Sequence, residues 1–166
     1  MEVVNKVAQS GLVTIDLEEY FPEREIAVFD LKDYLFKGLI LREKDFREAL
    51  AAHDWDQYTG KYLAVCCTAD AIIPNWAWML VTVHANAKAQ SVHFGTAEEV
   101  LAQLYDRIID TIDVEQYRDK RVVIKGCSDK PVPVEAYLEI TRKLEPLAKS
   151  IMYGEPCSTV PVFKRK

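Results

Sequence analysis

The chain has 166 residues, of which 49% are hydrophobic and 28% are charged, a composition typical of a folded globular protein rather than a disordered or fibrous one. Its formal net charge of -5 argues against general binding to nucleic acid, which needs clustered lysine and arginine. No stretch has the apolar length of a membrane span, and residues 1–11 lack the pattern of a secretory signal peptide. We therefore expect a cytoplasmic protein that binds neither nucleic acid nor membranes.

The first 58 residues have less regular patterns than the rest of the chain. Residues 11–17 (GLVTIDL) and 25–31 (EIAVFDL) predict two strands joined by a turn at Pro22. Residues 42–55 predict a helix that buries Phe46 and Leu50. We expect this segment to be an irregular N-terminal strand and helix extension that packs on the rest of the chain.

From residue 59 to residue 166, short apolar runs alternate with segments of helical period, which is typical of βα units. The pattern predicts strands at residues 61–67, 90–95, 121–126 and 150–154, with an edge piece at 160–163. Thr96 and Glu99 form a capping box, which marks the start of one of the intervening helices. The sequence therefore predicts a single α/β domain over residues 1–166, with three layers and a mostly parallel, Rossmann-like sheet. No tandem repeat at a fixed period is evident.

Two other predicted helices carry apolar residues at helical spacing, which predicts their buried faces. After Pro74 the spacing selects Trp76, Met79, Leu80 and Val83. From about Pro133 it selects Tyr137, Leu138, Ile140, Leu144 and Leu147. Trp76 and Trp78 cannot both face inward, so one of them is expected to form an exposed apolar patch that marks a protein partner or a homodimer interface.

Three of the four cysteines lie at or just beyond the predicted C-terminal end of a strand: Cys67, Cys127 and Cys157. Each is followed by a serine or threonine and then, a few residues on, by proline. Because the carboxyl ends of parallel strands share one edge of a sheet, we expect these three thiols to converge. In a reducing cytoplasm they are expected to be free thiols, metal ligands or catalytic groups rather than disulfides. Cys66 points to the opposite face of its strand and is predicted to be core.

Three converging thiolates would bind zinc, iron or an iron–sulfur cluster and leave a fourth position open. Asp70 is the nearest candidate for that position, followed by Asp129 and then His84. The competing interpretation is that the cysteines are buried residues at strand ends, because the chain has no CxxC and matches none of the compact metal motifs. The sequence contains no GxSxG, Walker or GxGxxG motif, so hydrolase and phosphate-cradling chemistry have no support.

Four segments carry a resemblance to a known family: LILREKDFREAL, ADAIIPNWAWML, RVVIKGCSDKPVP and SIMYGEPCSTVPVF. Together they resemble a family of small bacterial proteins classified as a domain of unknown function, over essentially the whole chain. Members look to be encoded near iron–sulfur cluster assembly genes, so the resemblance implies a role in cluster assembly or metal handling. It defines no catalytic residues.

Three functional hypotheses follow. The first is a metal-binding accessory protein that binds zinc or iron through Cys67, Cys127, Cys157 and Asp70. The second is an enzyme that uses one of these cysteines as a nucleophile or sulfur acceptor, activated by a helix N-terminus. The third is a non-catalytic interaction module whose cysteines are part of the core.

Overall fold

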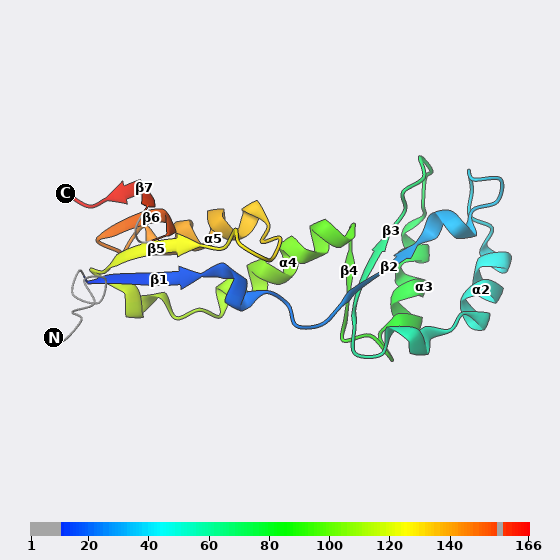
Figure 1. The fold of residues 1–166 in the computed structure, drawn as a ribbon. Helices are drawn as coiled ribbons and strands as arrows, with labels where there is room; N and C mark the ends of the chain where they lie inside the picture. The colour runs from blue at the N-terminus through cyan, green and yellow to red at the C-terminus, as the bar shows by residue number, and fades with distance from the viewer. Residues whose placement is uncertain (1–10, 156–157) are drawn as a thin grey trace. The chain divides into compact units, whose positions relative to one another are not determined.

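The structure is a computed structural model that describes residues 11–155 and 158–166 (Figure 1). Its contacts divide the chain into two compact units. Unit 2 is continuous from Glu23 to Leu101, whereas unit 1 consists of the segments before and after it, up to Pro22 and from Ala102. Unit 2 is therefore inserted into the sequence of unit 1. In the part of the chain that is described, no helix is both long and apolar enough to cross a membrane.

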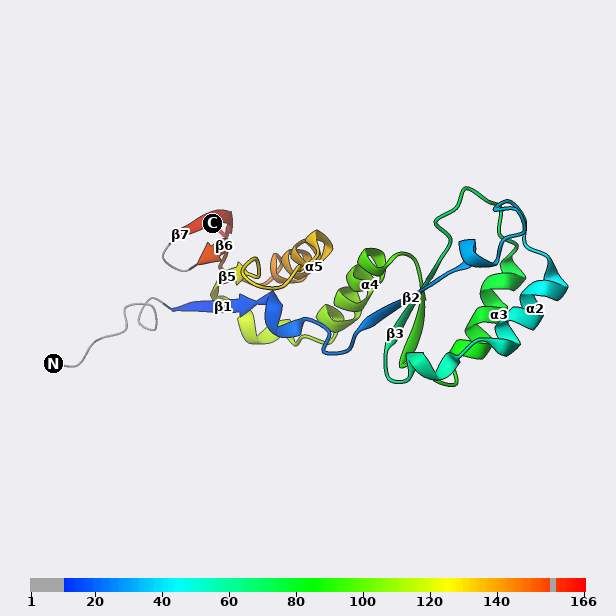
Figure 2. The ribbon, with the colours of Figure 1, turned by 45° about the vertical axis from the view of Figure 1, so that its right-hand side comes forward.

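Unit 2 contains a parallel three-stranded sheet in the order β2-β3-β4. The strands are β2 (Ile26–Asp30), β3 (Tyr62–Cys66) and β4 (Ser91–Phe94), and the helices are α2 (Glu43–Ala52) and α3 (Asn75–Ala85). Figures 1 and 2 both show α2 and α3 on the same side of this sheet. The core between them contains Leu63, Phe46, Leu50 and Val81, so the predicted burial of Phe46 and Leu50 is confirmed.

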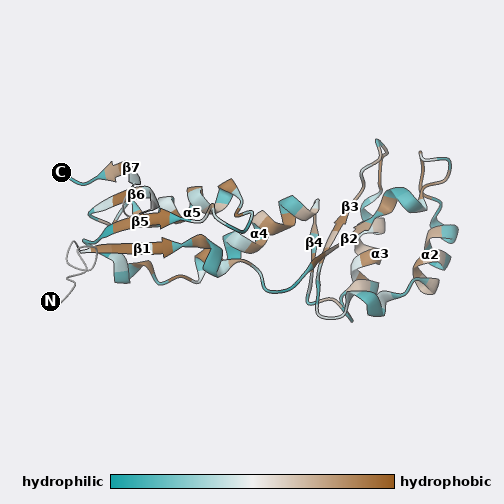
Figure 3. Cartoon of the chain, in the orientation of Figure 1, coloured by the Kyte–Doolittle hydropathy of each residue, from teal (hydrophilic) through white to brown (hydrophobic). Residues whose placement is uncertain are grey.

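Unit 1 contains a four-stranded sheet in the order β1-β5-β6-β7. The first three strands are parallel, whereas β7 runs antiparallel to β6 along one edge. The strands are β1 (Leu12–Asp16), β5 (Arg121–Lys125), β6 (Ser150–Glu155) and β7 (Ser158–Lys164), and the helices are most of α4 (Ala97–Asp110) and α5 (Val134–Leu144). Figure 3 shows β1 and β5 mostly in hydrophobic colours, as expected for strands paired on both sides or covered by helices. Pro161 is accommodated because β7 is an edge strand.

Four short 3₁₀ turns follow the same local rule. Each is preceded by an aspartate whose side chain accepts a hydrogen bond from the backbone N–H two residues on, at 3.0–3.1 Å. The four aspartates are Asp16, Asp30, Asp54 and Asp113. This local bond ends the extended chain and starts the turn, which is why aspartate stands at all four positions.

The two units repeat one arrangement of elements. Residues 54–95 align without a gap to residues 113–154, so that β3, α3 and β4 correspond to β5, α5 and β6. Residues 12–20 align in the same way to residues 26–34. The identical pairs are Asp54/Asp113, Gln57/Gln116, Tyr58/Tyr117, Lys61/Lys120, Asp70/Asp129, Pro74/Pro133, Ala77/Ala136, Thr82/Thr141, Ala89/Ala148, Ser91/Ser150 and Gly95/Gly154, with Asp16/Asp30, Leu17/Leu31 and Tyr20/Tyr34 before them.

Burial follows the same correspondence. Several fully buried side chains of unit 1 have fully buried counterparts in unit 2, when the same alignment is extended back to residues 46 and 105: Leu17 and Leu31, Tyr105 and Phe46, Ile109 and Leu50, Ile140 and Val81. The chain therefore contains an interrupted repeat, which a search for tandem repeats does not reveal. The repeat is hard to see in the sequence because one copy interrupts the other and because core positions need only similar volume and polarity, not identical residues.

The α/β class with mostly parallel strands is confirmed. The two strands predicted on either side of Pro22 are present as β1 and β2, but they lie in separate sheets, because β1 pairs with β5 and β2 pairs with β3. The first 58 residues are accordingly shared between the two units instead of forming one extension on residues 59–166. Whether residues 1–166 act as one cooperative domain stays a prediction.

Helix positions were predicted better than helix faces. The Thr96 and Glu99 capping box is confirmed: the Thr96 N–H donates to the Glu99 carboxylate at 2.7 Å, and the Glu99 N–H donates to Thr96 Oγ1 at 3.3 Å. In α3, however, the buried face is Ala77, Val81 and Ala85, while Met79 and Val83 are exposed. Because α3 is apolar nearly all round, the period of its sequence does not select one face.

Candidate functional site

A pocket of about 470 Å³ opens on unit 1, between α5 and the strands β5, β6 and β7. The described residues that line it are Ile124, Cys127, Val132, Val134, Tyr137, Thr141, Ile151, Met152, Tyr153 and Val162. None of these side chains is an acid, a lysine, an arginine or a histidine. The described wall is therefore apolar, apart from one thiol and three hydroxyl groups, which suits an uncharged ligand.

Two tyrosine hydroxyl groups flank the thiol of Cys127. Tyr153, on β6, donates its hydroxyl to Cys127 Sγ at 3.3 Å, and the hydroxyl oxygen of Tyr137, on α5, lies 3.1 Å from the same sulfur. The two rings meet edge to face, with centroids 5.8 Å apart and planes at 67°. Cys127 itself follows β5 and is exposed. Three segments distant in the sequence thus meet at one sulfur.

These hydroxyl groups change the acidity of the site. Hydrogen bonds from Tyr137 and Tyr153 lower the pKa of the Cys127 thiol, because they stabilise the charged sulfur. They outweigh partial burial and the nearby Glu18 charge, which both raise this pKa. The pKa of Tyr137 is raised by burial and by the sulfur, and that of Tyr153 is raised by its hydrogen bond to Cys127. Both phenols therefore remain hydrogen-bond donors when the thiol ionises.

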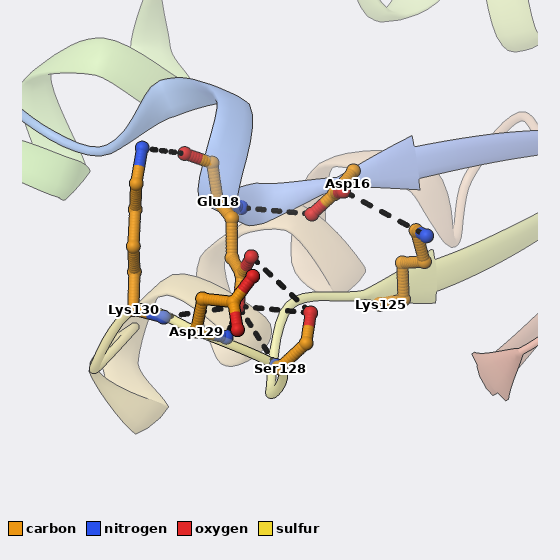
Figure 4. Close-up of polar contacts among 6 residues, drawn as sticks. All are labelled: Asp16, Glu18, Lys125, Ser128, Asp129 and Lys130. Carbon is orange, nitrogen blue, oxygen red and sulfur yellow. Dashed lines mark hydrogen bonds and ion pairs between the residues drawn. The ribbon is translucent and has the colours of Figure 1, made fainter.

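The loop that carries Cys127 is anchored by Glu18 (Figure 4). Three successive backbone N–H groups donate to Glu18 Oε1: Ser128 and Asp129 at 2.7 Å, and Lys130 at 3.2 Å. The Ser128 hydroxyl adds bonds at 3.2 and 3.3 Å to the two carboxylate oxygens. One carboxylate thus accepts hydrogen bonds from three backbone N–H groups of the loop and fixes the loop in place.

Gly126 leaves room for Tyr137 beside the cysteine. A Cβ atom at position 126 would lie 2.8 Å from the Tyr137 hydroxyl oxygen, a distance that Cβ atoms in proteins essentially never show. It would also lie 3.1 Å from Leu17 Cβ, which is an unusually tight contact. The backbone can therefore pass this close to Tyr137 only with glycine.

Substitution of Gly126 with alanine is expected to displace the Tyr137 hydroxyl from Cys127 and to raise the pKa of the thiol. The pH dependence of Cys127 alkylation measures this change. Cys67 stands at the equivalent position of unit 2, so Cys67→Ala is the matched control and should leave Cys127 unaffected. An unchanged alkylation profile in Gly126→Ala would show that the close approach to Tyr137 does not tune the thiol.

Replacement of Glu18 with glutamine is expected to loosen the loop over residues 128–130, and hydrogen exchange of their amides should accelerate. Hydrogen bonds hold the pKa of Glu18 below its ordinary value of 4.5. The stabilisation is therefore fully present above about pH 4.5 and is lost as the pH falls through the lowered folded-state pKa. Glu19→Gln, at the neighbouring exposed residue, is the control. Equal amide exchange in both variants would contradict the anchoring role.

The residues predicted for a metal site do not gather in one unit. Cys67 and Asp70 belong to unit 2, Cys127 belongs to unit 1, and Cys157 lies outside the described residues. Cys67 is half-buried and its thiol donates to the Ala69 carbonyl at 3.7 Å. Among residues 11–155 and 158–166, no three histidine, cysteine, aspartate or glutamate side chains are placed to hold a metal ion. The convergence of the three thiols stays a prediction. Cys66 is buried, as predicted, and burial raises its pKa.

The repeat corrects how the cysteine segments align. Their positions after a strand suggest that Cys67 corresponds to Cys127, but in the aligned units the equivalent of Cys67 is Gly126, and the equivalent of Cys127 is Thr68. The Thr68 N–H and hydroxyl both donate to Asp30, at 3.1 and 2.5 Å, so this residue ties the loop to β2. The recurrence of cysteine next to a hydroxyl residue is therefore not a repeated site.

The aromatic pair beside the cysteine has an equivalent in unit 2. Trp78 and Phe94 stand where unit 1 has Tyr137 and Tyr153, and their rings meet edge to face at 5.1 Å and 87°. The ring pair thus belongs to the fold that both units share. At these equivalent positions, the thiol and the two phenol hydroxyl groups are found in unit 1 and not in unit 2. Sequence reasoning missed the tyrosines as site residues and treated Tyr137 as core. An alignment of the two units marks both positions as aromatic, but only the folded structure places the two hydroxyl groups at the sulfur.

Fold and site together define a small α/β protein of two repeated units, one of which carries a cysteine flanked by two tyrosines in an apolar pocket. The chain belongs to the family described as Protein of unknown function (DUF2480), which matches residues 1–165. The predicted membership in a family of unknown function is thereby confirmed. No curated protein and no solved structure matches this chain. A link to iron–sulfur cluster assembly stays a prediction.

Proposed function

We propose that this protein is a thiol-dependent enzyme or carrier, in which Cys127 attacks an uncharged substrate and holds a group covalently. One observation carries the proposal: two tyrosine hydroxyl groups converge on one accessible sulfur at an apolar pocket. The thiolate is the nucleophilic form of cysteine, and the hydroxyl groups favour it.

The proposed activation of the Cys127 thiol by two tyrosine hydroxyl groups differs from the activation by a helix N-terminus that the sequence predicts. A helix N-terminus was predicted to stabilise the thiolate, but α5 begins at Val134, with Pro133 as its N-cap, and the stabilising contacts of Cys127 come from the tyrosines. Neutral donors lower the pKa of the thiol without adding a positive charge to the site. An uncharged substrate group can therefore approach the sulfur along an apolar wall.

Thiol chemistry is better supported than metal binding. Zinc or iron held by Cys67, Cys127, Cys157 and Asp70 rests on their predicted strand-end positions, and the groups nearest the Cys127 sulfur are phenols, not typical zinc ligands. An interaction module with core cysteines fits Cys66, but it does not explain the exposed and hydrogen-bonded Cys127. We propose that the protein acts in a reducing compartment such as the cytoplasm, where this thiol remains free.

The test is competitive labelling of the intact protein with a limiting amount of iodoacetamide at pH 7, followed by peptide mass spectrometry. Cys127 is expected to be modified well ahead of Cys66, Cys67 and Cys157. Labelling is repeated after treatment with a chelator and dialysis, because a metal-bound thiolate would become reactive only then. Equal and slow modification of all four cysteines, or fast modification of Cys127 after chelation alone, would overturn the proposal.

A further inference from the structure

We propose that the group accepted by Cys127 is an apolar acyl chain, delivered as a thioester. This inference rests on the proposed function and adds the class of substrate. The observations that carry it are the chemistry of the pocket wall, the donors around the sulfur and the absence of an acid or base among the described lining residues.

The wall of the pocket selects for an apolar chain. Val132, Val134, Ile151, Met152 and Val162 surround the space beside Cys127. Val134 and Val162 are 65% and 56% exposed, more than is usual for residues that only complete a core. A bound hydrocarbon chain would cover them, and each buried methylene would contribute about 0.8 kcal/mol. Charged substrate groups find no counter-ion among the described lining residues.

Thioester exchange is the acyl transfer that this set of groups can support. The Cys127 thiolate attacks the carbonyl carbon, a new carbon–sulfur bond forms, and the bond to the leaving sulfur breaks. The leaving thiolate carries away the electron pair and takes up a proton from water, so the step needs no oxidant, reductant or metal. Because one thioester is replaced by another, the exchange needs little driving force.

The two hydroxyl groups can act again after the attack. As the carbonyl carbon becomes tetrahedral, its oxygen acquires negative charge, and it forms within reach of groups that already surround the sulfur. Tyr137 and Tyr153 lie 3.1 and 3.3 Å from that sulfur and stay protonated, so each can transfer its hydrogen bond from the thiolate to the oxyanion. The charge then remains hydrogen-bonded throughout the step.

The site is better suited to holding an acyl group than to hydrolysing it. Hydrolysis needs a base to activate water, and the described lining residues contain no histidine, aspartate or glutamate. The acyl group on Cys127 is therefore expected to persist until another thiol attacks it. Unit 2 offers an internal comparison, because Thr68, Trp78 and Phe94 preserve the ring pair of the fold but supply neither a thiol nor phenol hydroxyl groups.

The experiment incubates the full-length protein with acetyl, hexanoyl and decanoyl thioesters of N-acetylcysteamine and follows acylation by intact-protein and peptide mass spectrometry. One acyl group is expected on Cys127, with a second-order rate at least about tenfold higher for hexanoyl than for acetyl, since the longer chain buries four more methylene groups. Cys127→Ser should not form the thioester. Cys157→Ser, in a residue outside the described structure, should still form it.

Val134→Ser tests the pocket wall. Val134 is the first residue of α5 and is exposed, so serine is tolerated there and the helix should form as before. This variant should lose most of the preference for long chains. Equal rates for all three thioesters would overturn the acyl-chain inference. Fast iodoacetamide labelling of Cys127 without acylation by any thioester would also overturn it and leave the proposed function standing, whereas slow iodoacetamide labelling would overturn both.

Discussion

Replacing Cys127 with serine is expected to remove the fast phase of thiol labelling and to leave the fold intact. The residue is exposed, and a serine hydroxyl can accept the same bonds from Tyr137 and Tyr153, so the free energy of unfolding should change by no more than about 0.5 kcal/mol. Labelling kinetics at pH 7 and urea unfolding of the same sample measure both quantities.

The matched control is Cys66→Ser. Cys66 is buried in β3 and its pKa is raised by burial, so this substitution places a hydroxyl group in the core. It should lower stability by about 1–3 kcal/mol and leave the fast labelling phase unchanged. A fast phase that survives in Cys127→Ser would assign the reactive thiol to another residue and refute the site.

Replacing Tyr105 with alanine is expected to give the largest loss of stability, about 3–5 kcal/mol. Tyr105 is fully buried in unit 1, and its hydroxyl donates to the Leu17 carbonyl at 2.8 Å. The alanine variant loses the packing of the ring and leaves that buried carbonyl without its partner. Denaturant unfolding measures the change.

The repeat supplies a milder variant, Tyr105→Phe, because phenylalanine occupies the equivalent position 46. It keeps the ring and loses the hydrogen bond, so the expected cost is about 1–3 kcal/mol. Burial raises the pKa of Tyr105 to about 12, above its usual 10. The stabilisation is therefore complete below pH 10 and is lost as the pH rises toward 12. Tyr105→Phe should lack this alkaline decline. Equal stability of the wild type and both variants would contradict the assigned role of Tyr105.

The sequence was a good guide to elements whose signals are local. The capping box at Thr96 and Glu99 and the burial of Phe46 and Leu50 each depend on residues within a few positions of one another. Strand order depends instead on contacts across the whole chain. β1 finds its partner more than 100 residues away, beyond the inserted unit 2, and the short-range pattern could not show this.

The candidate site was predicted only in part. The position of Cys127 after a strand follows from the apolar run of β5, and this marked it as a site residue. Its partners could not be recognised in the same way. Tyr137 lies on the amphipathic helix α5, where core residues and pocket residues recur at the same helical spacing. Tyr153 lies near the end of β6. Whether the two hydroxyl groups reach the sulfur depends on how α5 and β6 pack in the folded unit, including the room that Gly126 leaves for the Tyr137 hydroxyl.

The most direct test of the tyrosine-flanked thiol is the pH dependence of Cys127 alkylation in the wild type and in the Tyr137→Phe, Tyr153→Phe double variant. The phenylalanine rings preserve the edge-to-face contact that Trp78 and Phe94 make in unit 2 and remove only the hydroxyl groups. We expect an apparent pKa below that of an ordinary cysteine in the wild type and a higher one in the double variant. The same apparent pKa in both proteins would contradict the account.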